Sequence, residues 1–141
     1  MFTSTAKHTI EDILLPPDAI PAMPPQTLMK EALELMTAGR LGLACVVDEE
    51  GRLLGLFTDG DLRRLLLRSQ KPLSALFADD IIDHARTEFM SVDRHTGIAE
   101  ALSLLQEREI FDLPVLGPDR KLEGVVHLHP ALRALLESED A

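Results

Sequence analysis

The chain of 141 residues has no tryptophan, no tyrosine, five phenylalanines and one cysteine, Cys45. A lone cysteine excludes an intramolecular disulfide and is typical of a reducing compartment, so we expect a cytoplasmic protein. No apolar run approaches the roughly eighteen residues that a membrane span needs, and the N-terminus lacks the basic and apolar blocks of a signal peptide. Hydrophobic residues still make up 45% of the chain, so its interior has to be largely aliphatic.

Basic residues are also scarce. The chain carries 14 Lys and Arg against 24 Asp and Glu, a formal net charge of -10. Nucleic acids and anionic membrane surfaces are bound through clustered Lys and Arg. We therefore expect neither nucleic acid nor a membrane as a partner, and a soluble chain.

The sequence repeats itself at an offset of 69 residues, which places Ala32 over Ala101. The similarity runs without a gap from about Met23 to Leu66 and from Val92 to Leu135. Identical residues coincide at Thr27/Thr96, Glu31/Glu100, Leu33/Leu102, Leu35/Leu104, Val46/Val115, Leu53/Leu122, Gly55/Gly124 and Arg64/Arg133. Such periodicity indicates two copies of one supersecondary unit.

The first copy predicts the order helix, strand, strand, helix. The elements are a helix over Thr27–Gly39, strands over Leu41–Val47 and Arg52–Phe57 joined by a turn that ends at Gly51, and a helix over Asp59–Arg68. Apolar residues in the first helix follow the spacing of one amphipathic face. Thr27 is the expected N-cap, and Gly39 suits the C-terminus.

The second copy predicts the same order. Its elements are a helix over Ile98–Arg108, strands over Phe111–Leu116 and Lys121–His127 around a turn at 117–120, and a helix over Ala131–Glu137. A segment before each copy adds a further strand. One unit cannot cover both faces of its small sheet, whereas two packed units can. We expect an α+β fold of two pseudo-symmetric motifs, each a small sheet on two helices, in one compact pair.

We divide the chain into four parts: a Pro-rich N-terminal segment, 1–22, that contributes to the first motif; the first motif, 23–68; a connector, 69–86; and the second motif, 87–137. The N-terminal segment is expected to be extended after a helical turn at Thr9–Leu14. The connector carries Leu73, Leu76, Phe77, Ile81 and Ile82, so we expect it to pack against the core.

The first copy closes on Gly55-Leu56-Phe57-Thr58-Asp59-Gly60-Asp61 and continues Leu62-Arg63-Arg64. With the preceding helix, strand, turn and strand, this string resembles a CBS motif, whose pattern ends in Gly-x-x-Thr-x-x-Asp and a final helix. The resemblance covers nearly all of the chain, as a tandem CBS pair.

A narrower resemblance is to the C-terminal half of bacterial arabinose-5-phosphate isomerases, which join a sugar-isomerase domain to a CBS pair and make the precursor of the lipopolysaccharide sugar Kdo. It rests on Phe-Thr-Asp-Gly-Asp-Leu-Arg-Arg in the first copy and Gly-Val-Val-His-Leu-His in the second. The second motif departs from that family's usual His-x-His-Asp, because Pro130 stands in place of the Asp.

The resemblance implies a regulatory module that binds a nucleotide such as AMP, ATP or an S-adenosyl derivative between the repeats. Asp61 is then expected to accept hydrogen bonds from ribose hydroxyls, while Thr58 and the helix start favour phosphate. The wall of the site is expected near Leu41, Gly42, Leu43 and Ala44, where the CBS pattern places a strand that contacts the base. Gly42 lets a base or backbone approach closely, or is simply a turn residue.

Thr58 and Asp61 also have a purely structural interpretation, because a Thr followed three residues later by an acid is nearly a capping box. The second copy has His127 and Pro130 at these positions, and Pro is comfortable in a first helical turn. The helix therefore does not require the Thr–Asp pair. We favour one intact ligand site in the first copy and a degenerate one in the second, and expect Asp61→Ala to weaken binding without unfolding the domain.

Other candidates have less support. His127 and His129 lie two apart at a strand end, hence on one face, but two histidines without a convergent carboxylate make a weak metal site, so we predict none. Ordinary polar surface is the main alternative, with a phosphate contact by His127 as a third. The arginines of the closing helices, Arg63, Arg64 and Arg133, favour salt bridges over ligand contacts. Cys45 indicates a buried, inert thiol.

The residues offer no catalytic constellation, so we predict that this chain alone is not an enzyme and requires no cofactor. A nucleotide or a CMP-linked sugar would act as effector on an attached or partner sugar-isomerase domain. The alternative is a homodimerisation module with decayed ligand sites, which would use the apolar connector and Leu62, Leu65, Leu66 and Leu67.

Overall fold

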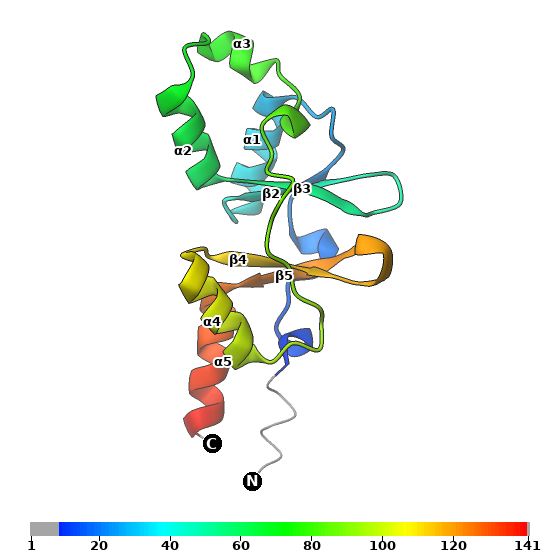
Figure 1. The fold of residues 1–141 in the computed structure, drawn as a ribbon, viewed down its shortest axis with the longest axis vertical. Coiled ribbons are helices and arrows are strands. Elements are labelled where there is room, and N and C mark those ends of the chain that lie inside the picture. Colours follow the sequence, from blue (N-terminus) through cyan, green and yellow to red (C-terminus); the bar gives the residue numbers. More distant parts are fainter. Residues whose placement is uncertain (1–8, 141) are drawn as a thin grey trace. The chain divides into compact units, whose positions relative to one another are not determined.

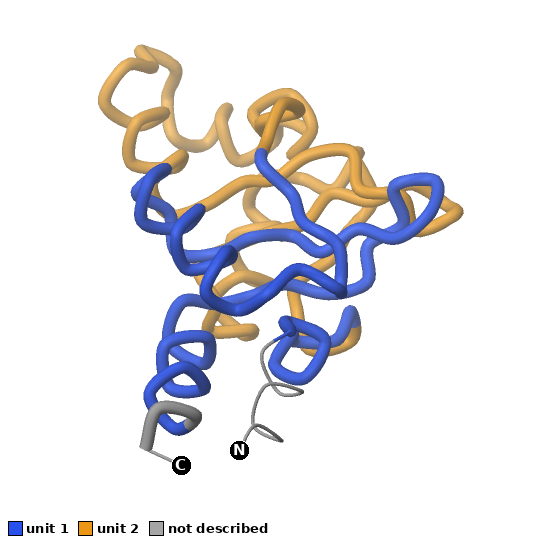
Figure 2. The backbone as a smooth tube through the Cα atoms, turned by 60° about the horizontal axis from the view of Figure 1, so that its bottom comes forward, with its two compact units in different colours: residues 1–17, 90–141 blue, residues 18–89 orange. Residues whose placement is uncertain are grey.

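The computed structural model describes residues 9–140. The chain forms two compact units, coloured separately in Figure 2. Unit 2 consists of residues 18–89, and residues 9–17 and 90–140 belong to unit 1.

Unit 2 contains a three-stranded sheet of order β1-β2-β3, in which β1 runs parallel and β3 antiparallel to β2. Its elements are β1 (Ala22–Met23), α1 (Met29–Gly39), β2 (Leu43–Val47), β3 (Leu53–Thr58), α2 (Asp59–Arg68), α3 (Leu73–Phe77) and a 3₁₀ turn at Ile81–Asp83. A further 3₁₀ turn, Pro17–Ala19, precedes β1. Figure 1 shows β2 and β3 as one hairpin that leads into α2.

Unit 1 repeats this plan around the antiparallel hairpin β4-β5. Its elements are a 3₁₀ turn at Ile10–Asp12, α4 (Ile98–Arg108), β4 (Asp112–Leu116), a 3₁₀ turn at Pro118–Arg120, β5 (Leu122–His127) and α5 (Leu128–Asp140). Each of the helices α4 and α5 and the strands β4 and β5 begins 69 residues after its counterpart α1, α2, β2 or β3. The repeat expected from the sequence is therefore a structural repeat.

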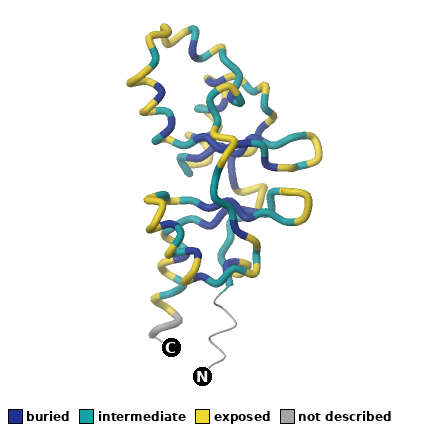
Figure 3. The backbone as a smooth tube through the Cα atoms, viewed as in Figure 1, coloured by how far each residue is buried: buried dark blue, intermediate teal, exposed yellow. Residues whose placement is uncertain are grey.

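Each unit has its own aliphatic core. Met29, Ala44 and Phe57 are among the buried residues of unit 2, and Ile98, Leu113 and Val126 among those of unit 1. Figure 3 shows that burial concentrates on the strands, while the hairpin tips are exposed. The connector packs as expected, since Leu76 and Ile81 are buried in the core of unit 2.

A segment from outside each repeat covers the outer edge of its hairpin. In unit 2, Leu56 of β3 and Arg86 of the connector exchange two backbone hydrogen bonds of 2.9 and 2.8 Å. In unit 1, Val125 of β5 and Leu15 exchange two of 3.0 and 2.8 Å. An isolated two-stranded hairpin is at best marginally stable in water, and its open edge can pair with another chain, so each hairpin is stabilised by such a covering segment.

The N-terminal segment is shared between the two units. We expected residues 1–22 to contribute to the first motif; residues 18–22 pack in the unit built from the first copy, and residues 9–17 pack in the unit built from the second copy, where Ile10 is fully buried. Residues 1–8, which the same expectation includes, lie outside the described residues. The repeat alone could not assign this segment, because pairing through single residues leaves no periodic pattern in the sequence.

Several predicted element ends are corrected. The N-cap of α1 is Leu28 and not Thr27, whose backbone instead accepts a hydrogen bond from Ile81. The expected end of α1 at Gly39 is confirmed, and Arg40 follows it in the left-handed conformation, with φ of 57°. α5 begins at Leu128, three residues before the expected start at Ala131, because Pro130 is tolerated in the first turn.

The glycine that both copies share lies under the crossing segment. A Cβ on Gly55 would lie 3.1 Å from both the Ala85 Cβ and the Arg86 carbonyl oxygen. A Cβ on Gly124 would overlap the Leu15 carbonyl oxygen and lie 2.5 Å from the Leu14 Cδ1. The repeated glycine therefore makes room for the strand that covers the hairpin edge.

We predict that Gly124→Ala lowers the free energy of unfolding by about 3 kcal/mol, because the added methyl group meets backbone that cannot move without breaking the Leu15 pairing. Gly51→Ala is the control: its φ of +84° adds strain, but no atom lies within 4 Å of the new Cβ, so about 1 kcal/mol is expected. Urea unfolding measures both. Equal losses would contradict the packing of residues 9–17 over Gly124.

Candidate functional site

The structure places five of the six predicted ligand-binding residues in unit 2. Gly42, Leu43 and Ala44 lie at the start of β2, and Leu43 pairs with Thr58 at the end of β3. Asp61 follows in the first turn of α2. The sixth, His127, ends β5 in unit 1.

Thr58 and Asp61 form a complete capping box at the start of α2. The Asp61 N–H donates to the Thr58 Oγ1 at 3.1 Å, and the Thr58 N–H donates to the Asp61 Oδ2 at 2.9 Å. Both interactions satisfy backbone groups that have no partner within the helix. The structural interpretation of the pair is therefore realised, whatever else the two side chains bind.

Two arginines also hold the Asp61 carboxylate, which is 8% exposed. Arg64, one turn along α2, donates from Nη2 to Oδ1 at 2.7 Å. Arg86, which covers the β3 edge, donates from Nε to Oδ2 at 3.1 Å. Burial acts to raise the pKa of Asp61, but the hydrogen bonds from Arg64, the Thr58 N–H and Arg86 outweigh it, so the pKa lies below 3.8. The carboxylate is charged at neutral pH.

The residues expected to form the wall of the ligand site are not equally accessible. The side chains of Leu43 and Ala44 are both buried, and Ala44 belongs to the core of unit 2. Gly42 adopts φ of +64°, and a Cβ there would lie 2.6 Å from the Asp59 Oδ2. Both the turn and the close approach of Asp59 therefore require a glycine.

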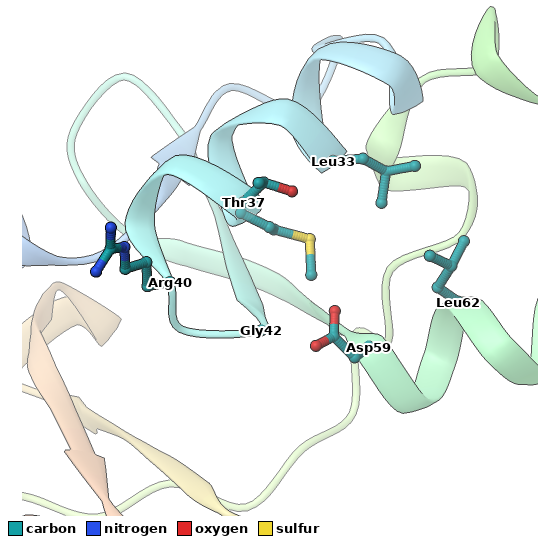
Figure 4. A pocket seen from close by; sticks show the side chains of 7 residues that line it. Leu33, Thr37, Arg40, Gly42, Asp59 and Leu62 are labelled. Carbon is teal, nitrogen blue, oxygen red and sulfur yellow. The ribbon is translucent and has the colours of Figure 1, made fainter.

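A cavity of about 320 Å³ opens beside Gly42, between the end of α1 and the start of α2. Figure 4 shows Leu33 and Thr37 projecting from α1, and Asp59 and Leu62 from α2. Met36 and Arg40 complete the lining. Of the predicted site residues, only Gly42 borders this cavity.

In unit 1 the equivalent positions carry different chemistry. Asp112 and His127 pair across the hairpin, as Leu43 and Thr58 do in unit 2, and the His127 Nδ1 lies 2.7 Å from the Asp112 Oδ1. His129 was expected on the same strand but lies in the first turn of α5, and its ring meets that of His127 edge-on at 5.3 Å. Burial raises the pKa of the Asp112 carboxyl, and His127 offsets this only in part.

Sequence reasoning missed Arg86 and Asp112. Asp112 could have been found from the repeat, because it is the partner of Leu43 at the 69-residue offset and both copies share one hairpin register. Arg86 has no such signal, since its position follows from the edge strand and not from a motif. Arg63 and Arg133 lie on the exposed faces of α2 and α5, and Cys45 is fully buried.

Among residues 9–140, no three or more His, Cys, Asp or Glu side chains form a group that could hold a metal ion. In the same range, no helix combines the length and the apolarity that crossing a membrane demands.

We predict that Asp61→Asn lowers the free energy of unfolding at pH 7 by about 2 kcal/mol, because the charged partner of two arginines and part of the capping box are lost. The folded pKa of Asp61 is depressed, so this stability is present above the ordinary Asp pKa of 3.8 and is lost as pH falls through the folded pKa. Chemical unfolding from pH 7 to pH 3 measures the difference. A gap that stays constant with pH would contradict the ion pairs.

Comparison with known proteins gives two kinds of relative. The chain is 34% identical over 125 residues to the arabinose 5-phosphate isomerase of Pseudomonas aeruginosa and 35% identical over 125 residues to that of Yersinia pestis. Each alignment covers 89% of this chain but 37% of the enzyme, so the chain spans little more than a third of these relatives.

Among solved structures, the chain is similar to CBSX2, a CBS-pair protein from Arabidopsis thaliana, in a crystal structure with AMP. The TM-score is 0.81 at 28% identity, over 94% of this chain and 98% of that one. The CBS domain profile matches twice, at residues 10–68 and 78–137. Both matches begin in the segments before the repeats, at Ile10 in one and at Ala78 in the other. The duplicated helix–strand–strand–helix unit, its shared glycine and these two matches establish that the chain belongs to the CBS domain family, as a tandem pair.

Proposed function

We propose that this chain is a regulatory module that binds an adenine nucleotide of the AMP type, with Asp61 receiving the ribose. The observation that supports it best is the likeness to CBSX2, whose crystal structure contains AMP. An ionised carboxylate beside two arginines is suited to a ligand that combines hydroxyl donors with a phosphate, since guanidinium groups bind phosphate oxygens in a fork.

The position of Asp61 supports this use. Its carboxylate is charged but almost buried, and it lies beside Thr58 in the first turn of α2, where backbone N–H groups and the helix dipole favour an anion. Unit 1 has Pro130 at the equivalent position and therefore offers no carboxylate there. We therefore propose that the nucleotide binds to residues of unit 2.

The arabinose 5-phosphate isomerases that share 34 and 35% identity with this chain suggest what it regulates. We place the pair beside a sugar-phosphate isomerase domain, either attached to it or as a partner, in lipopolysaccharide-sugar synthesis. A ligand changes such an enzyme only through a difference in affinity between two arrangements of the protein. A CMP-linked sugar is the alternative effector.

We predict that AMP binds the chain in isothermal titration and that Asp61→Asn weakens this binding at least tenfold, because the ribose hydroxyls lose a charged acceptor. Glu31→Gln is the matched control. This acid is exposed on α1 of the same unit, and its replacement should leave the affinity unchanged.

ATP and CMP-linked sugars belong in the same titration. If a CMP-linked sugar binds and AMP does not, the ligand is the CMP-linked sugar and not an adenine nucleotide. Silence across the whole panel would rule out the proposed sensor.

A second candidate is a homodimerisation module. Leu66, Leu67 and Leu73 are 49, 81 and 53% exposed, which leaves an apolar surface on α2 and at the start of α3. Leu65, expected to contribute, is 5% exposed and belongs to the core, and Leu62 packs against it. Exposed leucines that lie close together are typical of interaction surfaces.

We predict a dimer in analytical ultracentrifugation that Leu67→Glu converts to a monomer, because a carboxylate in an apolar contact has to be desolvated. Gln70→Glu adds the same charge just beyond the end of α2 and should leave the dimer intact. A wild-type chain that stays monomeric at the highest concentration tested would contradict this second candidate.

A further inference from the structure

Asp61 is the only acid that the proposed nucleotide site uses, yet its acceptor capacity is nearly filled. An ionised carboxylate offers about four lone-pair positions, two on each oxygen. On Oδ2, the Thr58 N–H at 2.9 Å and the Arg86 Nε at 3.1 Å take both. On Oδ1, the Arg64 Nη2 at 2.7 Å takes one. One position remains for a ligand.

A ribose presents two neighbouring hydroxyls, which fit a carboxylate best when each donates to a different oxygen. In the structure Oδ1 has room for one hydroxyl and Oδ2 has room for none. The Thr58 N–H cannot leave Oδ2 without breaking the capping box of α2. Arg86 is the group that has to move, because it is the other donor to that oxygen.

The two arginines are therefore not equivalent. Removing Arg86 leaves one open position on each oxygen, which matches a diol. Removing Arg64 leaves two open positions on Oδ1 and none on Oδ2, which does not. Both side chains are about half exposed, at 43% for Arg86 and 56% for Arg64, so either can swing into solvent.

We infer that Arg86 is a latch on the ligand site: the diol of the nucleoside binds Asp61 only after it displaces the Arg86 guanidinium from Oδ2. This inference rests on the proposed function, because it takes Asp61 as the acceptor of the ribose. It adds a residue that controls diol affinity and lies outside the motif.

Displacement of Arg86 also links ligand binding in unit 2 to the segment that leads into unit 1. Arg86 belongs to the segment that covers the β3 edge, with its backbone hydrogen-bonded in both directions to Leu56. Four residues later, at Met90, the chain enters unit 1. The segment is held to unit 2 by the Arg86 side chain, which donates to Asp61, and by its backbone, which pairs with Leu56. A ligand that displaces the Arg86 side chain removes the first of these two attachments.

The test titrates adenosine and 2′,3′-dideoxyadenosine, which lacks both hydroxyls, into the wild-type chain, Arg86→Gln and Arg64→Gln. We expect Arg86→Gln to bind adenosine about tenfold more tightly than the wild type, with dideoxyadenosine unchanged. Arg64→Gln removes the same charge from the same carboxylate and is the matched control, with less than a threefold gain expected. Thermal melts confirm the fold, and Arg86→Met replaces Arg86→Gln if the latter is unfolded.

Equal gains in adenosine affinity in both variants would overturn the latch. The gain would then come from the loss of a positive charge beside Asp61 and not from a vacated lone pair on Oδ2. A loss of adenosine affinity in Arg86→Gln would also overturn the latch, because it would make Arg86 a ligand contact. If the wild type binds AMP but neither variant changes the diol preference, the latch fails and the proposed function stands. If all three chains bind neither AMP nor adenosine, both fail. Binding that first becomes measurable in Arg86→Gln supports the latch.

Discussion

Each unit of this protein is built on a two-stranded hairpin, and a lone hairpin in water leaves unpaired backbone groups along both edges. Covering those edges is the constraint on which the rest of the structure depends. β1 and Val92 cover the β2 and β4 edges, and Arg86 and Leu15 cover those of β3 and β5. The shared glycines, Gly55 and Gly124, are small because the covering segments pass directly over them.

The same constraint explains which parts of the fold could be predicted from the sequence. The 69-residue repeat, α2 at Asp59–Arg68 and α4 at Ile98–Arg108 were predicted with correct bounds, because helical periodicity extends over several turns. The segments that cover the β3 and β5 edges were missed, since Leu15 and Arg86 each pair through one residue and show no alternation. A strand that short is specified by what it lies against, which a single sequence does not record.

The candidate site divides in the same way. Thr58 and Asp61 could be named from the sequence because they belong to one local motif, and the capping box follows from their spacing. The arginine that completes the environment of Asp61 comes from 25 residues away and enters through the edge strand. The sequence pattern also did not show that the side chains of Leu43 and Ala44 are buried.

Two nearly buried carboxylates show how the number of donors decides the direction in which the pKa of such a group shifts. Asp61 accepts hydrogen bonds from two guanidinium groups and a backbone N–H, and its pKa is lowered despite burial. Asp112 interacts with the single ring of His127, and burial raises its pKa. The two copies thus differ in the chemistry of the residues around the start of the last helix, while their hairpins keep the same register.

The exchange of edge segments has a consequence for how such a protein can be inherited. Residues 9–17 lie in one unit and the repeat that follows them lies in the other, so a gene fragment that encodes the second copy alone would lack the Leu15 pairing that covers the β5 edge. Recombination that shuffled single copies would leave hairpins with open edges, prone to aggregation. The pair, and not the single motif, therefore carries every segment that its hairpins need to cover their edges.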